Sequence, residues 1–234
     1  ANALLAIGAS PVMAHATEEV GEMVGLAGAL VLNIGTLSRS WIDAMFAAGQ
    51  AARARHLPIV LDPVGAGATR LRTETALRLL EEVKPTIIRG NASEILALAA
   101  GGGATKGVDA TRGVEEAREA AIALARSSGA LLVVTGPEDF MTDGERRFRL
   151  ANGHPLMSRV TGTGCVCSAL VGAFVAVQPD PLLASIGALT TYGVAGEMAA
   201  EGEPGPGTFR TRLIDALAEV TPEWVRQHAR LVVE

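Results

Sequence analysis

Lysine, aromatic side chains and long apolar runs are all scarce in this chain of 234 residues. The formal net charge is −5, and the only lysines are Lys84 and Lys106. A nucleic-acid surface needs a concentrated patch of positive charge, so we expect no nucleic-acid partner. The longest apolar stretch, residues 170–177, is far shorter than the ~18 residues that cross a bilayer, so we expect no membrane partner.

Cysteine is scarce as well, because Cys165 and Cys167 are the only two and a single residue separates them. This spacing is poor for a structural disulfide, and the first residues lack the pattern of a secretory signal peptide. Both features favour a reducing, cytoplasmic location. The hydrophobic content of 49% against 19% charged residues excludes a disordered chain.

Short apolar segments alternate with longer segments of helical character along the chain. Continuous apolar strands that are each followed by a helix are typical of a parallel sheet with helices on both faces. We therefore predict an α/β fold with a mostly parallel central sheet, in a single domain over residues 1–234. The sequence predicts strands at residues 28–35, 58–62, 85–89, 130–135, 146–150 (antiparallel to its neighbour) and near 231, and helices at 38–55, 73–83, 93–100, 114–127, 164–177, 181–200 and 208–220.

Polar residues follow several predicted strands at the point where each strand ends. Asp62 closes the second strand, Arg89 the third and Thr135 the fourth. Ligands of open parallel sheets bind at the carboxyl ends of the strands. We therefore expect these side chains to share one rim of the sheet and to form a site there.

Residues 162–165, Gly-Thr-Gly-Cys, open a predicted helix that is rich in Ala and Val. Two glycines let backbone amides face a bound group, and a helix N-terminus carries about half a positive charge, so this segment is suited to phosphate. A glycine turn before a packed helix explains the same residues equally well. The segment is neither a Walker A motif nor a GxGxxG fingerprint.

Cys165 lies in the first turn of this helix, where the helix terminus favours a thiolate. That position suits a general base or a nucleophile, whereas the commoner role of a free cysteine is that of a small buried residue. We assign the buried role to Cys167. The four histidines are far apart in the sequence and give no metal signature, and we expect His154 in solvent.

Asp62 and Glu94 each fall just beyond a predicted strand in apolar surroundings. Two carboxylates beside a phosphate site can hold Mg²⁺, directly or through its waters. The alternatives are a turn cap for Asp62 and a helix-terminus role for Glu94. Arg89 at the end of a buried strand favours phosphate contact, and a salt bridge to either carboxylate is the alternative.

Seven segments of the chain resemble, in their order, the hydroxyethylthiazole kinase family, a thiamine-pathway branch of the ribokinase-like superfamily. The resemblance runs nearly from end to end, and several of its motifs are specific to this family. The matching segments are residues 9–14, 30–37, 62–69, 89–91, 106–109, 160–165 and 205–209.

The resemblance implies a ribokinase-like kinase that uses ATP and Mg²⁺ to phosphorylate the hydroxyl of 4-methyl-5-(2-hydroxyethyl)thiazole, for thiamine biosynthesis or salvage. Cys165 occupies the position where most of the superfamily places a catalytic Asp, and we expect it to assist the reaction modestly. By the same resemblance, Met13 and Gly162 bind the alcohol substrate, Arg89 and Thr135 bind ATP, and Glu94 and Asp62 bind the metal.

Two further expectations come from the resemblance alone. Family members assemble as homotrimers with active sites at subunit interfaces, and we expect the same assembly here. They also carry one more strand before the segment that matches Ala1, and we expect that strand to be missing from this sequence.

Four other functions stay open on the sequence alone. A kinase of the same superfamily that acts on the pathway's pyrimidine alcohol leaves the segment around Met13 unexplained. A repair dehydratase for damaged nicotinamide cofactors shares the fold, and a thiol hydrolase would use Cys165 and His154. A nucleotide sensor without catalysis leaves the paired carboxylates without a role.

Overall fold

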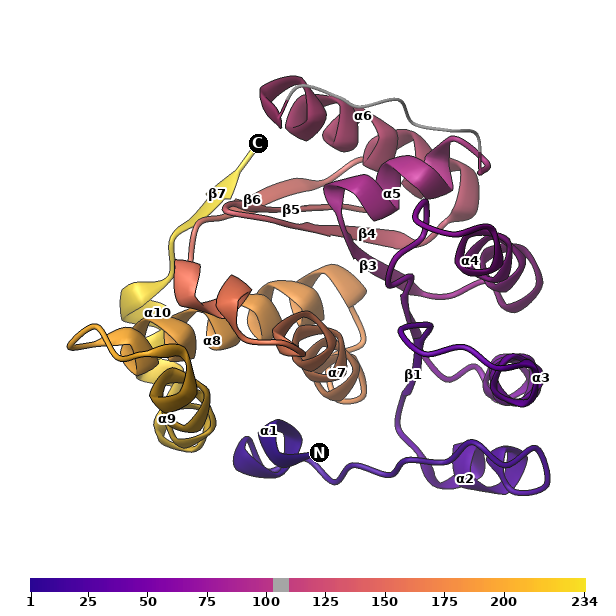
Figure 1. Cartoon of the computed structure of the whole chain (residues 1–234), viewed down its shortest axis with the longest axis horizontal. Helices are drawn as coiled ribbons and strands as arrows, with labels where there is room; N and C mark the ends of the chain where they lie inside the picture. The colour runs from indigo at the N-terminus through magenta and orange to yellow at the C-terminus, as the bar shows by residue number, and fades with distance from the viewer. Residues whose placement is uncertain (103–109) are drawn as a thin grey trace.

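A seven-stranded sheet forms the centre of the computed structural model, which describes residues 1–102 and 110–234. The motif at residues 106–109 lies outside the described residues. The strands lie in the sheet in their sequence order (Figure 1). The first four strands are parallel, β1 (Leu30–Asn33), β2 (Ile59–Asp62), β3 (Ile87–Asn91) and β4 (Leu131–Thr135), and three antiparallel strands extend the sheet, β5 (Asp139–Thr142), β6 (Arg147–Leu150) and β7 (Leu231–Val233).

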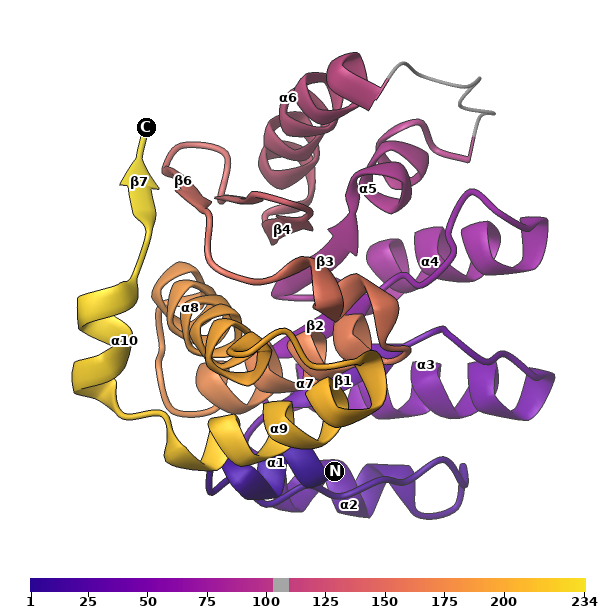
Figure 2. The same ribbon diagram turned by 60° about the vertical axis from the view of Figure 1, so that its left-hand side comes forward.

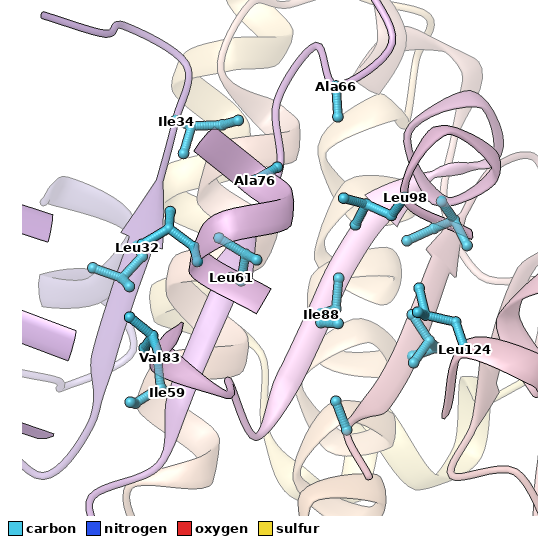
Figure 3. Packing of buried hydrophobic residues seen from close by; sticks show 14 of the residues in the cluster. Leu32, Ile34, Ile59, Leu61, Ala66, Ala76, Val83, Ile88, Leu98 and Leu124 are labelled. Atoms are coloured by element: carbon cyan, nitrogen blue, oxygen red, sulfur yellow. The ribbon is translucent and has the colours of Figure 1, made fainter. Parts of the chain in front are cut away.

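One face of the sheet is covered by the helices that connect the parallel strands and by one helix that precedes them. Right-handed crossovers between successive neighbouring strands all return on the same side, so their helices share a face. Strand and helix side chains meet there in one apolar cluster, which includes Leu61, Ile88, Val83 and Leu98 (Figure 3). The helices of this face are α2 (Val20–Leu26), α3 (Arg39–Ala54), α4 (Arg70–Val83), α5 (Ala92–Ala99) and α6 (Ala110–Ser128).

The opposite face is covered mainly by the helices of the C-terminal half (Figure 2). Alternate strand residues supply its core, because Ile59 and Leu61 belong to the first cluster whereas Val60 belongs to the second. Helix α8 has 13 buried residues among its 20, which is typical of a helix packed between other elements. The helices of this face are α1 (Asn2–Ala6), α7 (Thr163–Val175), α8 (Pro181–Ala200) and α9 (Pro206–Glu219).

The prediction of an α/β fold with helices on both faces is confirmed, and so is the antiparallel pairing of the strand predicted at residues 146–150. Its partner β5 was not predicted, because that strand is only four residues long and directly follows a Gly-Pro turn. Helix α4 begins at Arg70, three residues before its predicted start, because the Thr69 side chain caps it by accepting from the Arg72 N–H. The helices α1, α2 and α10 (Pro222–His228) and the 3₁₀ turn Pro155–Arg159 were also not predicted.

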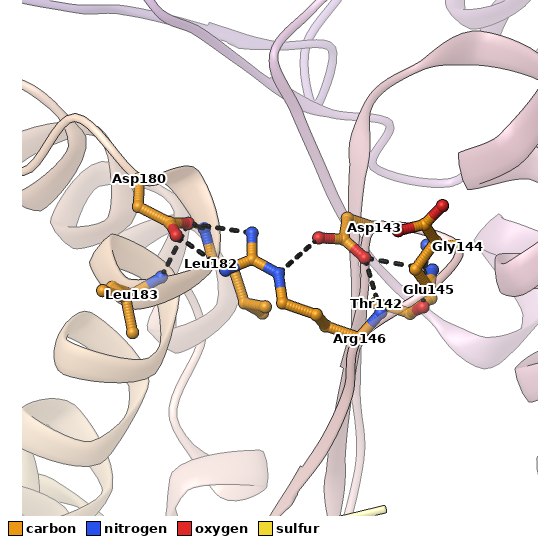
Figure 4. Close-up of polar contacts among 8 residues, drawn as sticks. All are labelled: Thr142, Asp143, Gly144, Glu145, Arg146, Asp180, Leu182 and Leu183. Carbon is orange, nitrogen blue, oxygen red and sulfur yellow. Dashed lines mark hydrogen bonds and ion pairs between the residues drawn. The ribbon is translucent and has the colours of Figure 1, made fainter.

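The turn between β5 and β6 is fastened to the start of α8 (Figure 4). Arg146 donates from Nε to Asp143 and from Nη1 to Asp180, at 2.7 Å in both cases. Asp180 is also the N-cap of α8 and accepts from the backbone N–H of Leu182 at 2.9 Å. Arg146 lowers the pKa of Asp180 through this hydrogen bond. Within the described part of the chain, no helix combines the length and the apolar character needed to cross a membrane.

Candidate active site

A cavity of about 520 Å³ opens at the carboxyl ends of β3 and β4. Its position agrees with the rule that ligands of open α/β sheets bind at the strand ends. Five parts of the chain line it. They are Arg89 of β3, the β4–β5 connection with Thr135, Gly136, Pro137 and Asp139, most of the segment 152–158 after β6, Thr163, Gly164 and Cys167 of α7, and Leu189, Tyr192 and Gly193 of α8.

Arg89 and Thr135 are joined directly at this rim. Arg89 Nη2 donates a hydrogen bond of 2.6 Å to Thr135 Oγ1, across the paired strands β3 and β4. The Arg89 side chain is only 12% exposed, and its Nη1 lies 4.0 Å from a carboxylate oxygen of Asp62. The guanidinium is therefore a fixed, permanently charged group at the cavity wall, and such a group is suited to phosphate.

Asp62 is a buried carboxylate with one oxygen in use and one free. Its Oδ2 accepts from Asn33 Nδ2 at 2.9 Å and from Ser168 Oγ at 2.7 Å. Its Oδ1 has no hydrogen-bond partner among the described residues. Burial raises the pKa of Asp62, and Arg89 and the Ser168 hydroxyl lower it by less. Asp62 does not itself line the cavity, so its role at a metal stays a prediction.

Glu94 joins the loop after β2 to the start of α5. Its Oε2 accepts from the Asn91 N–H at 2.8 Å while Asn91 Oδ1 accepts from the Glu94 N–H, which together form a capping box. Its Oε1 accepts from the Gly65 N–H at 2.8 Å. The helix-terminus role considered for Glu94 is therefore present. Its role at a metal stays a prediction.

The start of α7 borders the cavity. Gly162 is the N-cap and has a φ of +89°, which a glycine adopts without strain. A Cβ atom at Gly164 would lie 3.0 Å from Arg89 Nη1, so a glycine there lets the guanidinium approach the helix terminus. The positive end of the helix and the arginine therefore face the same space, which is suited to an anion.

Two hydroxyl groups fix this helix start. Thr163 Oγ1 donates to the Met157 carbonyl at 2.8 Å, and Tyr192 Oη donates to the Thr163 carbonyl at 3.1 Å. Burial raises the pKa of Tyr192, so the phenol stays protonated and keeps its donor role. Sequence analysis included Thr163 in the segment 162–165 without a role for its hydroxyl, and it missed Tyr192, which lies in the interior of a predicted helix.

The two cysteines lie in different surroundings. Cys165 is exposed and does not line the cavity. Cys167 is buried, as expected, and also borders the cavity, which the sequence did not indicate. Burial raises the pKa of the Cys167 thiol to about 11, although Arg89 opposes the shift. His154 is exposed, as predicted, and its Nδ1 accepts from the Leu156 N–H.

Asp139 is a cavity residue that the sequence analysis did not single out. Its Oδ1 accepts from the Gly136 N–H at 3.0 Å, which closes the turn after β4. Burial raises the pKa of Asp139 to about 6, against the opposing effects of the Gly136 N–H and Arg89. The carboxyl group therefore adds a titratable acid to the wall beside Arg89.

Arg89 is hydrogen-bonded to Thr135 and lies 4.0 Å from Asp62, so these three predicted site residues are brought together. Glu94 contacts the loop after β2 through the Gly65 N–H. Met13 is 84% exposed and, like Cys165, does not line the cavity. Within residues 1–102 and 110–234, no three His, Cys, Asp or Glu side chains converge on a point that could hold a metal. Ser168 was missed, although it lies three residues after Cys165, about one helical turn along α7.

The mostly parallel sheet with helices on both faces and a cavity at the strand ends is a ribokinase-like fold. Pyridoxal kinase from Staphylococcus aureus in complex with AMP-PCP has this fold, with a TM-score of 0.56 and 19% identity over 77% of this chain and 67% of that one. Pyridoxal kinase from Bacillus subtilis in an ADP complex gives a TM-score of 0.56 with 24% identity, over 79% of this chain and 72% of that one.

The sequence matches the model of the hydroxyethylthiazole kinase family over residues 1–223, and the chain belongs to that family. Hydroxyethylthiazole kinase of Desulfotalea psychrophila is 53% identical over 99% of this chain and 85% of its own length. That of Pyrococcus furiosus is 51% identical over 100% and 88%. The solved hydroxyethylthiazole kinase structure from Pyrococcus horikoshii superposes with a TM-score of 0.91, at 45% identity over 100% of this chain and 88% of that one.

Proposed function

We propose that this protein transfers the γ-phosphoryl group of ATP to the hydroxyl of 4-methyl-5-(2-hydroxyethyl)thiazole, yielding thiazole phosphate for thiamine synthesis. Membership of the hydroxyethylthiazole kinase family supports the substrate. The observation that carries the proposal is the Arg89–Thr135 pair at a cavity that the start of α7 also borders. This combination supplies a fixed cation and a helix terminus to a triphosphate.

In the proposed reaction, the alcohol oxygen forms a bond to the γ-phosphorus while the bond to the bridging oxygen of ADP breaks. The hydroxyl proton passes to solvent or to a nearby base. Arg89 stabilises the charge on the transferring group, and the backbone at Gly162 lies beside the reacting hydroxyl. Cys165 assists only modestly, because phosphoryl transfer depends chiefly on positioning and charge stabilisation.

We propose Mg²⁺ as the cofactor. Oxygen donors suit this ion, and Asp62 offers a buried carboxylate oxygen without a partner among the described residues. Glu94 already accepts two backbone N–H groups, so it fits a contact through a metal-bound water. When bound, the ion would neutralise charge on the phosphates. We expect Asp62→Asn to raise the Mg²⁺ concentration needed for half-maximal rate by more than about tenfold.

We also propose a homotrimer in which Met13 completes the substrate pocket of a neighbouring subunit. The exposed apolar side chains of Val12 and Met13 support an interface at this segment. Light scattering coupled to size exclusion measures the assembly directly, and a monomer would contradict it. A reducing, cytoplasmic setting fits the two free thiols, Cys165 and Cys167.

The direct test of the proposed function is an assay with ATP and Mg²⁺ in which hydroxyethylthiazole and hydroxymethylpyrimidine are offered in parallel. Mass spectrometry identifies the phosphorylated product. We expect thiazole phosphate alone. Product from the pyrimidine alone would keep the phosphate site but overturn the substrate, and no product from either would favour the dehydratase or hydrolase.

A further inference from the structure

Glu197 and Arg230, which do not line the cavity, contact the segment 151–153 that forms one of its walls. Asn152 and Gly153 line the cavity, and Glu197 of α8 accepts from the Gly153 N–H at 2.7 Å and from Asn152 Nδ2 at 3.2 Å. Arg230 pairs with both oxygens of Glu197, at 2.6 and 3.2 Å. It also donates to the Ala151 carbonyl at 2.6 Å. Residues 151–153 are therefore held by a two-pronged ion pair.

Backbone groups of the C-terminal segment complete this attachment. The Arg230 N–H donates to Asn152 Oδ1 at 2.7 Å, and Asn152 Nδ2 donates to the His228 carbonyl at 2.9 Å. The Ala151 N–H donates to the Arg230 carbonyl at 3.0 Å. Asn152 is buried, so each lost partner would leave a buried polar atom without a hydrogen bond. We call Glu197, His228 and Arg230 the clasp.

The wall has little room to shift on its inner side. A Cβ atom at Gly193 of α8 would lie 2.6 Å from Asn152 Cβ and 2.9 Å from its carbonyl carbon. Gly153 has a φ of +127°, a conformation that turns the chain at this point. Asn152 therefore packs directly against α8, and a shift of residues 151–153 would change the cavity that Asn152 and Gly153 line.

The C-terminal segment has a second attachment besides the clasp. Strand β7 pairs with β6 through Phe148, Arg149 and Leu150, and these ladder bonds anchor the chain end beside the sheet (Figure 2). The ion pair of α10, between Arg226 and Glu223, stays within the helix. The clasp contacts fall on residues 151–153, of which Asn152 and Gly153 line the cavity, so we expect their effect on the cavity.

We propose that Glu197 and Arg230 are positioning residues for nucleotide binding, which act by holding the wall formed by Asn152 and Gly153. The proposal rests on the proposed function, because it takes the cavity as the nucleotide site. Loss of the clasp would let the wall move and weaken the nucleotide complex, while the alcohol site and the chemical step would keep their groups.

The test compares Arg230→Ala, Arg230→Lys and Arg226→Ala with the wild type, as full chains. Calorimetry measures the affinity for ADP with Mg²⁺, kinetics give KM for ATP and for the thiazole alcohol, and thermal unfolding gives Tm. Arg230→Ala should weaken ADP binding about tenfold, which corresponds to about 1.4 kcal/mol. The lysine variant should recover part of the loss, and Arg226→Ala, four residues away, should match the wild type.

Unchanged ADP affinity in Arg230→Ala would overturn the proposal, and so would an equal rise of both KM values together with a fall in Tm. A wild-type chain that binds no ADP would overturn both the clasp and the nucleotide site. ADP binding that responds to Arg230 in a chain that makes no thiazole phosphate would support the clasp and contradict the proposed function alone.

Discussion

The Arg89 guanidinium donates a hydrogen bond of 2.6 Å to the Thr135 hydroxyl, and both side chains line the same cavity. The two residues are 46 positions apart in the sequence and meet because β3 and β4 are parallel neighbours that end at one edge of the sheet. The pair fixes the direction of the arginine fork. A fixed fork matches phosphate oxygens without the loss of side-chain freedom that a mobile lysine would incur.

Arg89→Lys keeps the charge beside Asp62 but loses the fork and the bond to Thr135. We expect kcat/KM for ATP to fall about 100-fold, the scale of losing one well-placed donor in an active site. Arg78→Lys is the control, since Arg78 is exposed, pairs with Glu82 of its own helix, stacks on the Phe46 ring and lies outside the cavity. Steady-state kinetics give the comparison. A change of less than threefold in the Arg89 variant would contradict its proposed role.

Cys165→Asp should preserve or raise turnover, because our account gives the thiol only a modest part in the reaction. Cys165 is exposed and Cys167 is buried, so a thiol reagent should label Cys165 rapidly and Cys167 only after unfolding. Complete loss of turnover in Cys165→Asp would point to a step that requires the thiol. Counting the labelled thiols before and after unfolding checks the second expectation.

Asp139→Asn should stabilise the protein at pH 7. Burial raises the pKa of Asp139 from 3.8 to about 6, so this group's contribution to stability is complete below pH 3.8 and is lost as the pH rises through 6. An asparagine keeps an acceptor for the Gly136 N–H and has no charge to bury. The gain in unfolding free energy should reach about 3 kcal/mol at pH 7 and shrink toward pH 4.

Asp143→Asn is the control for this experiment, and we expect it to change the unfolding free energy in the opposite direction. Hydrogen bonds from Arg146 and from backbone N–H groups outweigh burial and lower the pKa of Asp143, so its contribution is present above pH 3.8 and is lost on acidification. Its removal should therefore destabilise the protein at neutral pH. Urea unfolding at pH 4.5 and pH 7 measures both variants, and a pH-independent effect of Asp139→Asn would contradict the assignment.

Two variants of Asp180 distinguish the stability contributed by the helix cap from that contributed by the surface ion pair. Asp180→Asn keeps an oxygen for the Leu182 N–H but loses the charge that Arg146 contacts, whereas Asp180→Ala loses both. Since exposed ion pairs contribute little, we expect less than about 0.5 kcal/mol for the asparagine and about 1 kcal/mol for the alanine. Thermal unfolding measures the two variants. Equal losses would show that the ion pair, and not the cap, holds the start of α8.

Much of the fold could be predicted because the parallel strands are short, apolar and closed by polar residues. The same logic placed Asp62, Arg89 and Thr135 on one rim, where the structure brings them together. Strand β5 and the residues around Asp139 could not be predicted in this way. Their sequence is short, mixed in polarity and adjacent to a Gly-Pro turn, so it carries no clear period.

The orientation of α7 about its axis could not be predicted from the sequence either. Cys165 and Cys167 point to different sides of the helix, and which of them faces the cavity depends on the approach of Arg89 to Gly164. The clasp joins segments more than 70 residues apart, and such pairings leave no local pattern. The binding and catalytic roles predicted for all seven site residues stay predictions until variants are assayed: Met13, Asp62, Arg89, Glu94, Thr135, Gly162 and Cys165.

The most direct test of the account is a crystal structure of the protein with AMP-PCP and Mg²⁺. We expect the β- and γ-phosphates within hydrogen-bond distance of Arg89 and Thr135, at the first turn of α7, with the rest of the nucleotide in the cavity beside Asn152 and Gly153. A nucleotide bound elsewhere, with this cavity left to solvent, would contradict the account.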